Sequence, residues 1–177
     1  SNNESEVAFF KIAFQVSMLT FTIGSIVNSV IGPRITEMYQ KNKFDMLQKF
    51  IAIGSSIAFF TTLVISAFFT LYAENIIELV YGVEYLDAIP LLIILLFQKV
   101  FITFFGPVHV LLAMTGWESK LWRINLVFVL ARIALDFVLI KNFGAIGAVS
   151  GMFLTTAIHV VVLWLLIRKE LSTNQLN

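Results

Sequence analysis

Five apolar runs, each long enough to cross a lipid bilayer, are the feature that most restricts what this chain can fold into. The runs cover residues 7–32, 50–72, 88–113, 122–140 and 145–167. A membrane-spanning helix needs about 20 predominantly apolar residues, and only helices or closed barrels satisfy backbone hydrogen bonds in lipid. Of 177 residues, 59% are hydrophobic and 13% charged, whereas soluble domains carry about 25% charged residues. We therefore predict an all-α integral membrane protein with five transmembrane helices in one domain, residues 1–177.

The composition and motifs also exclude several classes of function. The chain has no cysteine, which rules out disulfides and thiolate sites. Its net charge of +1 is too small for the basic footprint of nucleic-acid binding. The two histidines lack a zinc-binding spacing, and the sequence contains no nucleophile-elbow, P-loop or dinucleotide-binding motif. We therefore expect no metal, no cofactor, no nucleic-acid partner and no enzymatic activity.

The basic residues between the runs predict the orientation of the chain. Residues 33–49, 114–123 and the tail after 167 together carry eight Lys or Arg residues. Residues 73–87 carry none, and residues 141–144 carry one. Cytoplasmic loops of membrane proteins are enriched in Lys and Arg. We therefore expect the N-terminus outside and the C-terminus in the cytoplasm, as an odd number of spans requires.

Proline and glycine indicate where the predicted helices end or bend. We expect Gly32-Pro33 to stop the first span, and Pro90 suits the first turn of the third, where a missing N–H costs nothing. Gly106-Pro107 lies inside the third run and predicts a kink. Residues 74–87 mix apolar, acidic and tyrosine side chains, a pattern that predicts a short interfacial helix and a turn.

The first run carries polar side chains along one helical face. At about 100° per residue, the members of this stripe fall within an arc of about 80°. They are Lys11, Gln15, Met18, Thr22, Ser25 and Ser29, with Asn28 on a neighbouring face. The serines and threonine suit either a water-filled cavity or close helix packing, as is common in membranes. For Lys11 and Gln15 we favour a position in the cavity or at its outer mouth. The alternative for Lys11, which lies near the end of the helix, is that its side chain extends to the membrane–water interface.

The fourth run places Asn125, Arg132 and Asp136 on one helical face. Arg132 and Asp136 are four residues apart and can pair, which is the least costly way to hold two charges in a span. A charge at mid-span costs at least about 2.5 kcal/mol on insertion scales. Such residues commonly face a bundle interior or an aqueous path and mark a functional site. The alternative is a structural ion pair that fixes the helix register.

The third run contains Lys99, which would either contact an anionic substrate or pair with an acid from another helix. Asp136 is the only acid inside the five runs, so the charge within the predicted spans is net positive. An uncompensated cation favours an anionic ligand, such as a phosphate or carboxylate, over a cationic drug.

The fifth run opens with the small-residue pair Gly147 and Gly151, followed at the same spacing by Thr155 and His159. This spacing indicates close helix packing. A histidine at this depth would titrate in a proton-coupled cycle, or it would simply be hydrogen-bonded within the bundle.

Four short motifs occur in a characteristic order along the chain. They are Asn28-Ser29-Val30-Ile31-Gly32-Pro33-Arg34-Ile35-Thr36-Glu37-Met38-Tyr39, Tyr81-Gly82-Val83-Glu84-Tyr85-Leu86-Asp87-Ala88, Gly106-Pro107 through Leu111-Leu112-Ala113-Met114-Thr115-Gly116, and Phe143-Gly144-Ala145-Ile146-Gly147-Ala148. Together they resemble the polysaccharide flippases, the oligosaccharide exporters of the MATE-like MOP superfamily. The resemblance implies a bacterial inner-membrane protein of twelve or fourteen helices in two lobes. This chain would form helices eight to twelve, without the N-terminal lobe.

The resemblance also implies a transport activity and its partners. The cargo would be an undecaprenyl-diphosphate-linked oligosaccharide, which the protein would move across the membrane by alternating access, often driven by an ion gradient. Membrane lipids would be further partners. Candidate substrate-binding residues are Arg132, Lys99, Lys11, Gln15 and Asn125, and candidate coupling residues are Asp136 and His159. The alternatives are a multidrug or cation antiporter of the same superfamily, or a membrane scaffold that transports nothing.

Overall fold

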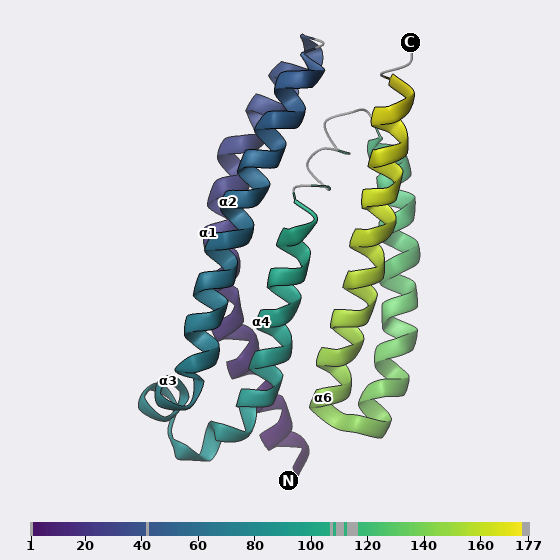
Figure 1. Ribbon diagram of the computed structural model, residues 1–177. Helices are drawn as coiled ribbons and strands as arrows, with labels where there is room; N and C mark the ends of the chain where they lie inside the picture. Colours follow the sequence, from purple (N-terminus) through teal and green to yellow (C-terminus); the bar gives the residue numbers. More distant parts are fainter. Residues whose placement is uncertain (1, 42, 107, 109–111, 113–116, 175–177) are drawn as a thin grey trace.

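The computed structural model of the chain is a bundle of long helices (Figure 1). It describes residues 2–41, 43–106, 108, 112 and 117–174. The elements are α1 (Asn2–Gln40), α2 (Phe44–Leu71), α3 (Ala73–Val80), the 3-10 helix η1 (Val83–Ala88), α4 (Ile89–Phe104) and α6 (Glu118–Asn174). All regular structure in the described residues is helical, which confirms the predicted all-α class.

Helix α4 is the centre of the bundle and contacts α1, α2 and α6. Its buried leucines are Leu91, Leu92, Leu95 and Leu96. Residues spaced in this way cover one broad face of a helix, so α4 can fill the space between its neighbours. Pro90 occupies the first turn of α4, as predicted.

Helix α1 continues through Pro33 to Gln40, so the prediction that Gly32-Pro33 stops it is wrong. Proline removes one backbone hydrogen bond, but helices of membrane proteins tolerate this loss. Beyond the proline, Ile35 is fully buried and belongs to an apolar cluster with Leu47 and Leu163. Packing of the last turns of α1 therefore outweighs the local cost of the proline.

The third predicted run also differs from the structure. Helix α4 ends at Phe104, and Gly106 follows with a φ of 72°. This left-handed conformation favours glycine because a Cβ would be strained there. Instead of a kinked helix through 88–113, the structure has a helix end before Gly106. Pro107 and most residues from 109 to 116 lie outside the described part of the chain.

Helix α6 reverses direction at Gly144, so that its two arms lie side by side (Figure 1). Gly144 has non-helical dihedral angles, φ 59° and ψ −138°. We call residues 118–143 the first arm and residues 145–174 the second arm; they contain the predicted runs 122–140 and 145–167. A Cβ on Gly147 would overlap the carbonyl of Leu139 on the first arm. This contact confirms the predicted packing role of the glycine pair.

Three helical stretches of the described chain are long and apolar enough to cross a membrane: Asp45–Leu71, Val83–Phe104 and Ser119–Arg168. The last of them contains both arms of α6. The first predicted run, 7–32, lies in α1, but the side chains of 23–32 are outside the described set. Five spans therefore stay a prediction, whereas a helical protein that crosses the membrane several times is established.

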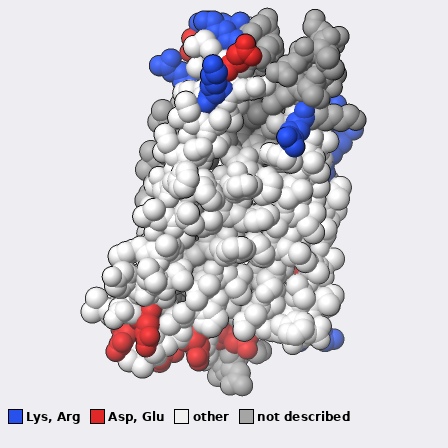
Figure 2. Space-filling model, in the orientation of Figure 1, with Lys and Arg blue, Asp and Glu red and all other residues white. Residues whose placement is uncertain are grey.

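Charged side chains collect at the two ends of the bundle (Figure 2). The basic end, where α1 meets α2, carries exposed Lys and Arg side chains with a few acids among them. Its exposed basic residues are Arg34, Lys41, Lys43, Lys49, Lys120, Arg123 and Arg168. There Lys41 Nζ donates to Glu37 Oε1 at 2.8 Å, which lowers the pKa of the Glu37 carboxyl. The acidic end, formed by α3, η1 and the Gly144 turn, carries Glu74, Glu78, Glu84 and Asp87 on exposed positions.

Residues 74–87 form a short helix and a turn, as predicted. Helix α3 ends beside Gly82, whose φ of 108° reverses the chain into η1. Ile77 is fully buried against the bundle, whereas Leu79 is 87% exposed. The location of this segment at a membrane interface stays a prediction.

Candidate functional site

The first arm of α6 carries an ion pair at mid-length. Arg132 Nε donates to Asp136 Oδ2 at 3.0 Å, with 36% and 22% of the two side chains exposed. This confirms the predicted pairing. The carboxylate faces the second arm, where a Cβ on Gly151 would lie 2.6 Å from Asp136 Oδ1. Glycine at 151 therefore leaves the space in which the Asp136 carboxylate sits between the two arms.

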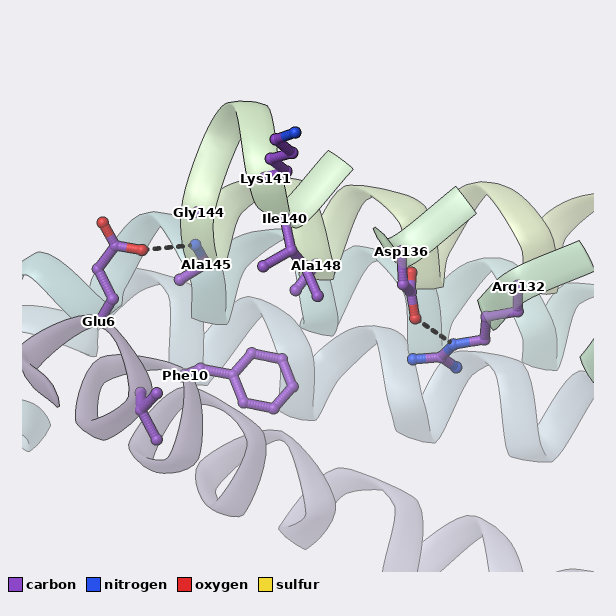
Figure 3. A pocket seen from close by; sticks show the side chains of 10 residues that line it. Glu6, Phe10, Arg132, Asp136, Ile140, Lys141, Gly144, Ala145 and Ala148 are labelled. Carbon is purple, nitrogen blue, oxygen red and sulfur yellow. Dashed lines mark hydrogen bonds and ion pairs between the residues drawn. The ribbon is translucent and has the colours of Figure 1, made fainter. Parts of the chain in front are cut away.

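A pocket of about 650 Å³ lies between α1 and α6 (Figure 3). It is lined by Glu6, Val7, Phe10, Arg132, Asp136, Ile140, Lys141, Gly144, Ala145 and Ala148. Figure 3 shows Glu6 beside the Gly144 turn and the Arg132–Asp136 pair farther along the pocket. We call this space the larger pocket. It combines an apolar wall with charged groups of both signs.

A second pocket, of about 300 Å³, lies between the two arms of α6 and also contains Arg132. Its other lining residues are Asn125, Phe128, Val129, Thr155, Thr156 and His159. The His159 ring stands 4.5 Å from the Phe128 ring, centroid to centroid. Asn125 and Arg132 thus share one face, as predicted, and His159 joins them from the second arm. We call this space the smaller pocket; Arg132 borders both pockets.

The start of the second arm is capped by a residue from the other end of the sequence. Ala145 N–H donates to Glu6 Oε2 at 2.9 Å, across 139 residues (Figure 3). The first N–H groups of a helix lack partners within the helix, and a carboxylate there also complements the helix dipole. Sequence reasoning missed Glu6. The glycine at 144 marks the break, but nothing local identifies the capping partner.

Helix α4 contributes a polar anchor and a buried lysine. Gln98 Nε2 donates to the Met152 carbonyl at 3.1 Å and to Thr156 Oγ1 at 3.0 Å, which ties α4 to the second arm. Lys99 is only 7% exposed and lines neither of the pockets beside Arg132. Lys99 and Arg132 therefore do not meet in either of these two pockets.

The polar stripe members of α1 whose side chains are described point away from the core of the bundle. Lys11 and Gln15 are exposed, whereas Ile12, Ala13 and Val16 on the other side of the helix are buried. Neither Lys11 nor Gln15 lines the two pockets. Of the other stripe members, Met18 is half-buried and Thr22 is exposed, whereas the side chains of Ser25 and Ser29, and of Asn28 on the neighbouring face, lie outside the described set.

The Arg132 guanidinium, which borders both pockets, is the group there that suits an anion. Arg132 uses Nε to bind Asp136, and a guanidinium has further N–H donors on its terminal nitrogens. Planar guanidinium groups bind carboxylates and phosphates through paired hydrogen bonds. Among the described residues, no group of three His, Asp or Glu side chains is arranged to hold a metal ion.

Comparisons with known proteins show which sequences this chain is similar to. A family model described as "Polysaccharide biosynthesis protein" matches residues 1–90. The chain is 27% identical over 165 residues to the "Probable low-salt glycan biosynthesis flippase Agl15" of Haloferax volcanii. The alignment covers 90% of this chain and 34% of that relative, so the chain spans about a third of the relative's length. No solved structure matches the chain.

Proposed function

Because the chain belongs to the polysaccharide biosynthesis protein family, we propose that it is part of a flippase for lipid-linked oligosaccharide. The chain is a multi-pass membrane protein, with three stretches long and apolar enough to span a bilayer. Its relative in Haloferax volcanii is named as a glycan biosynthesis flippase. The role proposed for this chain is that of a transporter, not of an enzyme.

The observation that carries the proposal is the position of Arg132 between two pockets. A lipid carrier linked through a diphosphate, such as undecaprenyl diphosphate, presents an anion to the membrane interior. Arg132 is partly exposed and borders the larger and the smaller pocket, so it can meet this anion from either side. Asp136 holds the guanidinium in place, and Asn125 adds an amide to the smaller pocket.

The remaining candidates take secondary roles in this proposal. Lys11 and Gln15, exposed on α1, would face the transport path and contact the sugar. Lys99 would meet cargo only after α4 and its neighbours separate, because it is nearly buried in this arrangement. Asp136 and His159 would couple transport to an ion gradient, since Asp136 Oδ1 is buried without a hydrogen-bond partner among the described residues.

The proposal also places the chain in a larger transporter. The chain would form most of the C-terminal lobe of a twelve- or fourteen-helix protein and work by alternating access against an N-terminal lobe. The segregation of charge (Figure 2) supports an orientation with the basic end in the cytoplasm. In the bacterial inner membrane, the cargo would then move from the basic end toward the acidic end.

Substitution of Arg132 in the full-length protein tests this function. We expect Arg132→Gln to slow flipping of lipid-linked oligosaccharide in proteoliposomes at least about tenfold, which corresponds to ~1.4 kcal/mol. Arg132→Lys should retain part of the rate, because it keeps the charge but not the planar donor geometry. Arg123→Gln, on the same arm at the basic end, is the matched control and should flip normally.

The double variant Arg132→Gln/Asp136→Asn separates binding from folding. It removes both charges, so it leaves no unpaired carboxylate in the span and should fold at normal levels. We expect it to remain as slow as Arg132→Gln. Flipping at the wild-type rate by either variant would refute the proposed role of Arg132.

A further inference from the structure

The described residues that line the larger pocket come from two elements. Helix α1 provides Glu6, Val7 and Phe10, and helix α6 provides all of its other lining residues. Any movement of α1 relative to α6 therefore changes the width of this pocket. The hydrogen bond from Ala145 N–H to Glu6 Oε2 joins the two elements at the acidic end.

The Gly144 turn is shaped around the Glu6 carboxylate. A Cβ on Gly144 would overlap this carboxylate, with Glu6 Cδ only 2.8 Å away. The positive φ of 59° at Gly144 separately favours glycine. Glycine at 144 thus permits the backbone conformation of the turn and also leaves room for the Glu6 carboxylate.

No side chain beside the turn takes over the capping role in the described structure. Gly144 itself has no side chain, and Asn142 Nδ2 donates back to the Val138 carbonyl at 2.8 Å. The second arm therefore depends on α1 for its side-chain cap. Because Glu6 is exposed, water can hydrate the carboxylate as soon as the hydrogen bond opens. This bond can accordingly break and re-form without leaving a buried charge.

We propose that Glu6 is a latch that closes the acidic end of the larger pocket. With the hydrogen bond formed, α1 is held against the Gly144 turn and the approach to the Arg132–Asp136 pair from this end is narrow. With the bond broken, α1 and the hairpin of α6 separate and the approach widens. The use of this opening for cargo release rests on the proposed function, whereas the latch itself does not.

Cysteine labelling measures the opening directly. The chain has no cysteine, so Ala148→Cys introduces its only thiol, in the lining of the larger pocket. The variant is made in full-length protein from which any other cysteines have been removed. The rate of reaction with a membrane-impermeant maleimide is measured in nanodiscs. We expect Glu6→Ala to raise this rate at least about threefold. Ser5→Ala, the neighbouring exposed position, is the control and should not change it.

The conservative variant identifies the capping bond as the cause. Glu6→Gln keeps a side-chain oxygen that accepts from Ala145 N–H, so it should label more slowly than Glu6→Ala. Equal rates for the two variants, or a wild-type rate for Glu6→Ala, would overturn the proposal.

A distance measurement separates opening from unfolding. Spin labels at Val7→Cys and Lys141→Cys, on exposed positions of α1 and the first arm, report the separation of the two elements. In Glu6→Ala we expect an added population at longer distance with unchanged helical circular dichroism. An unchanged distance distribution would contradict the latch. Wild-type flipping by Arg132→Gln would refute the proposed function alone, whereas unchanged labelling and distances in Glu6→Ala would refute the latch alone, so failures of the two ideas are distinguishable.

Discussion

Helix α4 and the first arm of α6 are both apolar, yet they occupy opposite kinds of environment. Leucines on α4 are fully buried among α1, α2 and α6. The first arm instead exposes large side chains such as Val127, Ile133 and Phe137, at 63%, 62% and 75%. In lipid, such exposure has no hydrophobic cost, because lipid tails are as apolar as the side chains. A peripheral helix can therefore turn its polar face inward.

The two cations within these helices show what this difference means for function. Lys99 on α4 is 7% exposed, whereas the side chain of Arg132 on the first arm is 36% exposed and borders two pockets. Both residues are basic groups inside apolar runs. Their surroundings distinguish them: Lys99 lies in a packed core, whereas a ligand can reach Arg132.

The comparison predicts the largest loss of stability at the centre of α4. Leu95→Ala should lower the free energy of unfolding by about 2–5 kcal/mol, through the cavity it leaves. We expect a loss in the lower half of this range. When the helices separate in an apolar phase, Leu95 is surrounded by hydrocarbon and not by water, so its burial in the bundle contributes less free energy. Val127→Ala on the first arm should change it by less than about 0.5 kcal/mol. Unfolding in detergent micelles compares the two, and equal losses would break the distinction between core and periphery.

A smaller loss is expected where the two arms of α6 touch. Gly147→Ala places a methyl group against the Leu139 carbonyl, and overpacking of this kind costs about 1–3 kcal/mol. The neighbouring change Ile146→Ala, at a half-exposed position, is the control. If Gly147→Ala melts at the wild-type temperature, the close approach of the arms is wrong.

The polar anchor of α4 should contribute less again. Gln98→Leu removes two hydrogen bonds to the second arm, and such bonds in membrane proteins average about 0.6 kcal/mol. We expect a loss of about 1 kcal/mol in the same unfolding measurement, summed over the two bonds. The conservative change Gln98→Asn has a side chain too short to reach both acceptors, so its stability should lie between those of the wild type and Gln98→Leu. A fully stable Gln98→Leu would show that apolar packing alone joins α4 to α6.

The smallest effect belongs to the exposed pair at the basic end. The bond from Lys41 lowers the pKa of Glu37 below its ordinary value of 4.5. A lowered folded-state pKa stabilises the protein above the unfolded-state pKa, and this contribution disappears as the pH falls through the folded-state pKa. Lys41→Ala should therefore raise the pKa of Glu37 toward 4.5, without a measurable change in melting temperature near neutral pH. A titration that leaves the pKa of Glu37 unmoved would contradict this.

The parts of the molecule that follow from local spacing could be predicted from the sequence. The pairing of Arg132 with Asp136 follows from a separation of one helical turn, and the close contact at Gly147 follows from the small-residue pair. The polysaccharide flippase family was also recognisable from short motifs, and the family comparison confirms it.

Features that depend on distant residues could not be predicted in this way. The helix passes Pro33 because residues such as Leu163 bury the turn that follows it. Likewise, the capping of Ala145 by Glu6 joins residues 139 positions apart, a distance over which helical periodicity carries no information. The burial of Lys99 depends on packing by neighbouring helices, which an apolar run does not reveal.

Binding of a diphosphate lipid to the full-length protein in nanodiscs tests the central claim most directly. The measurement compares Arg132→Gln with Lys99→Gln, each checked for normal helical content and melting temperature. The account predicts that Arg132→Gln weakens binding at least about tenfold and Lys99→Gln less than about threefold, that is ~1.4 and ~0.7 kcal/mol. Unchanged affinity in Arg132→Gln, or the larger loss in Lys99→Gln, would contradict it.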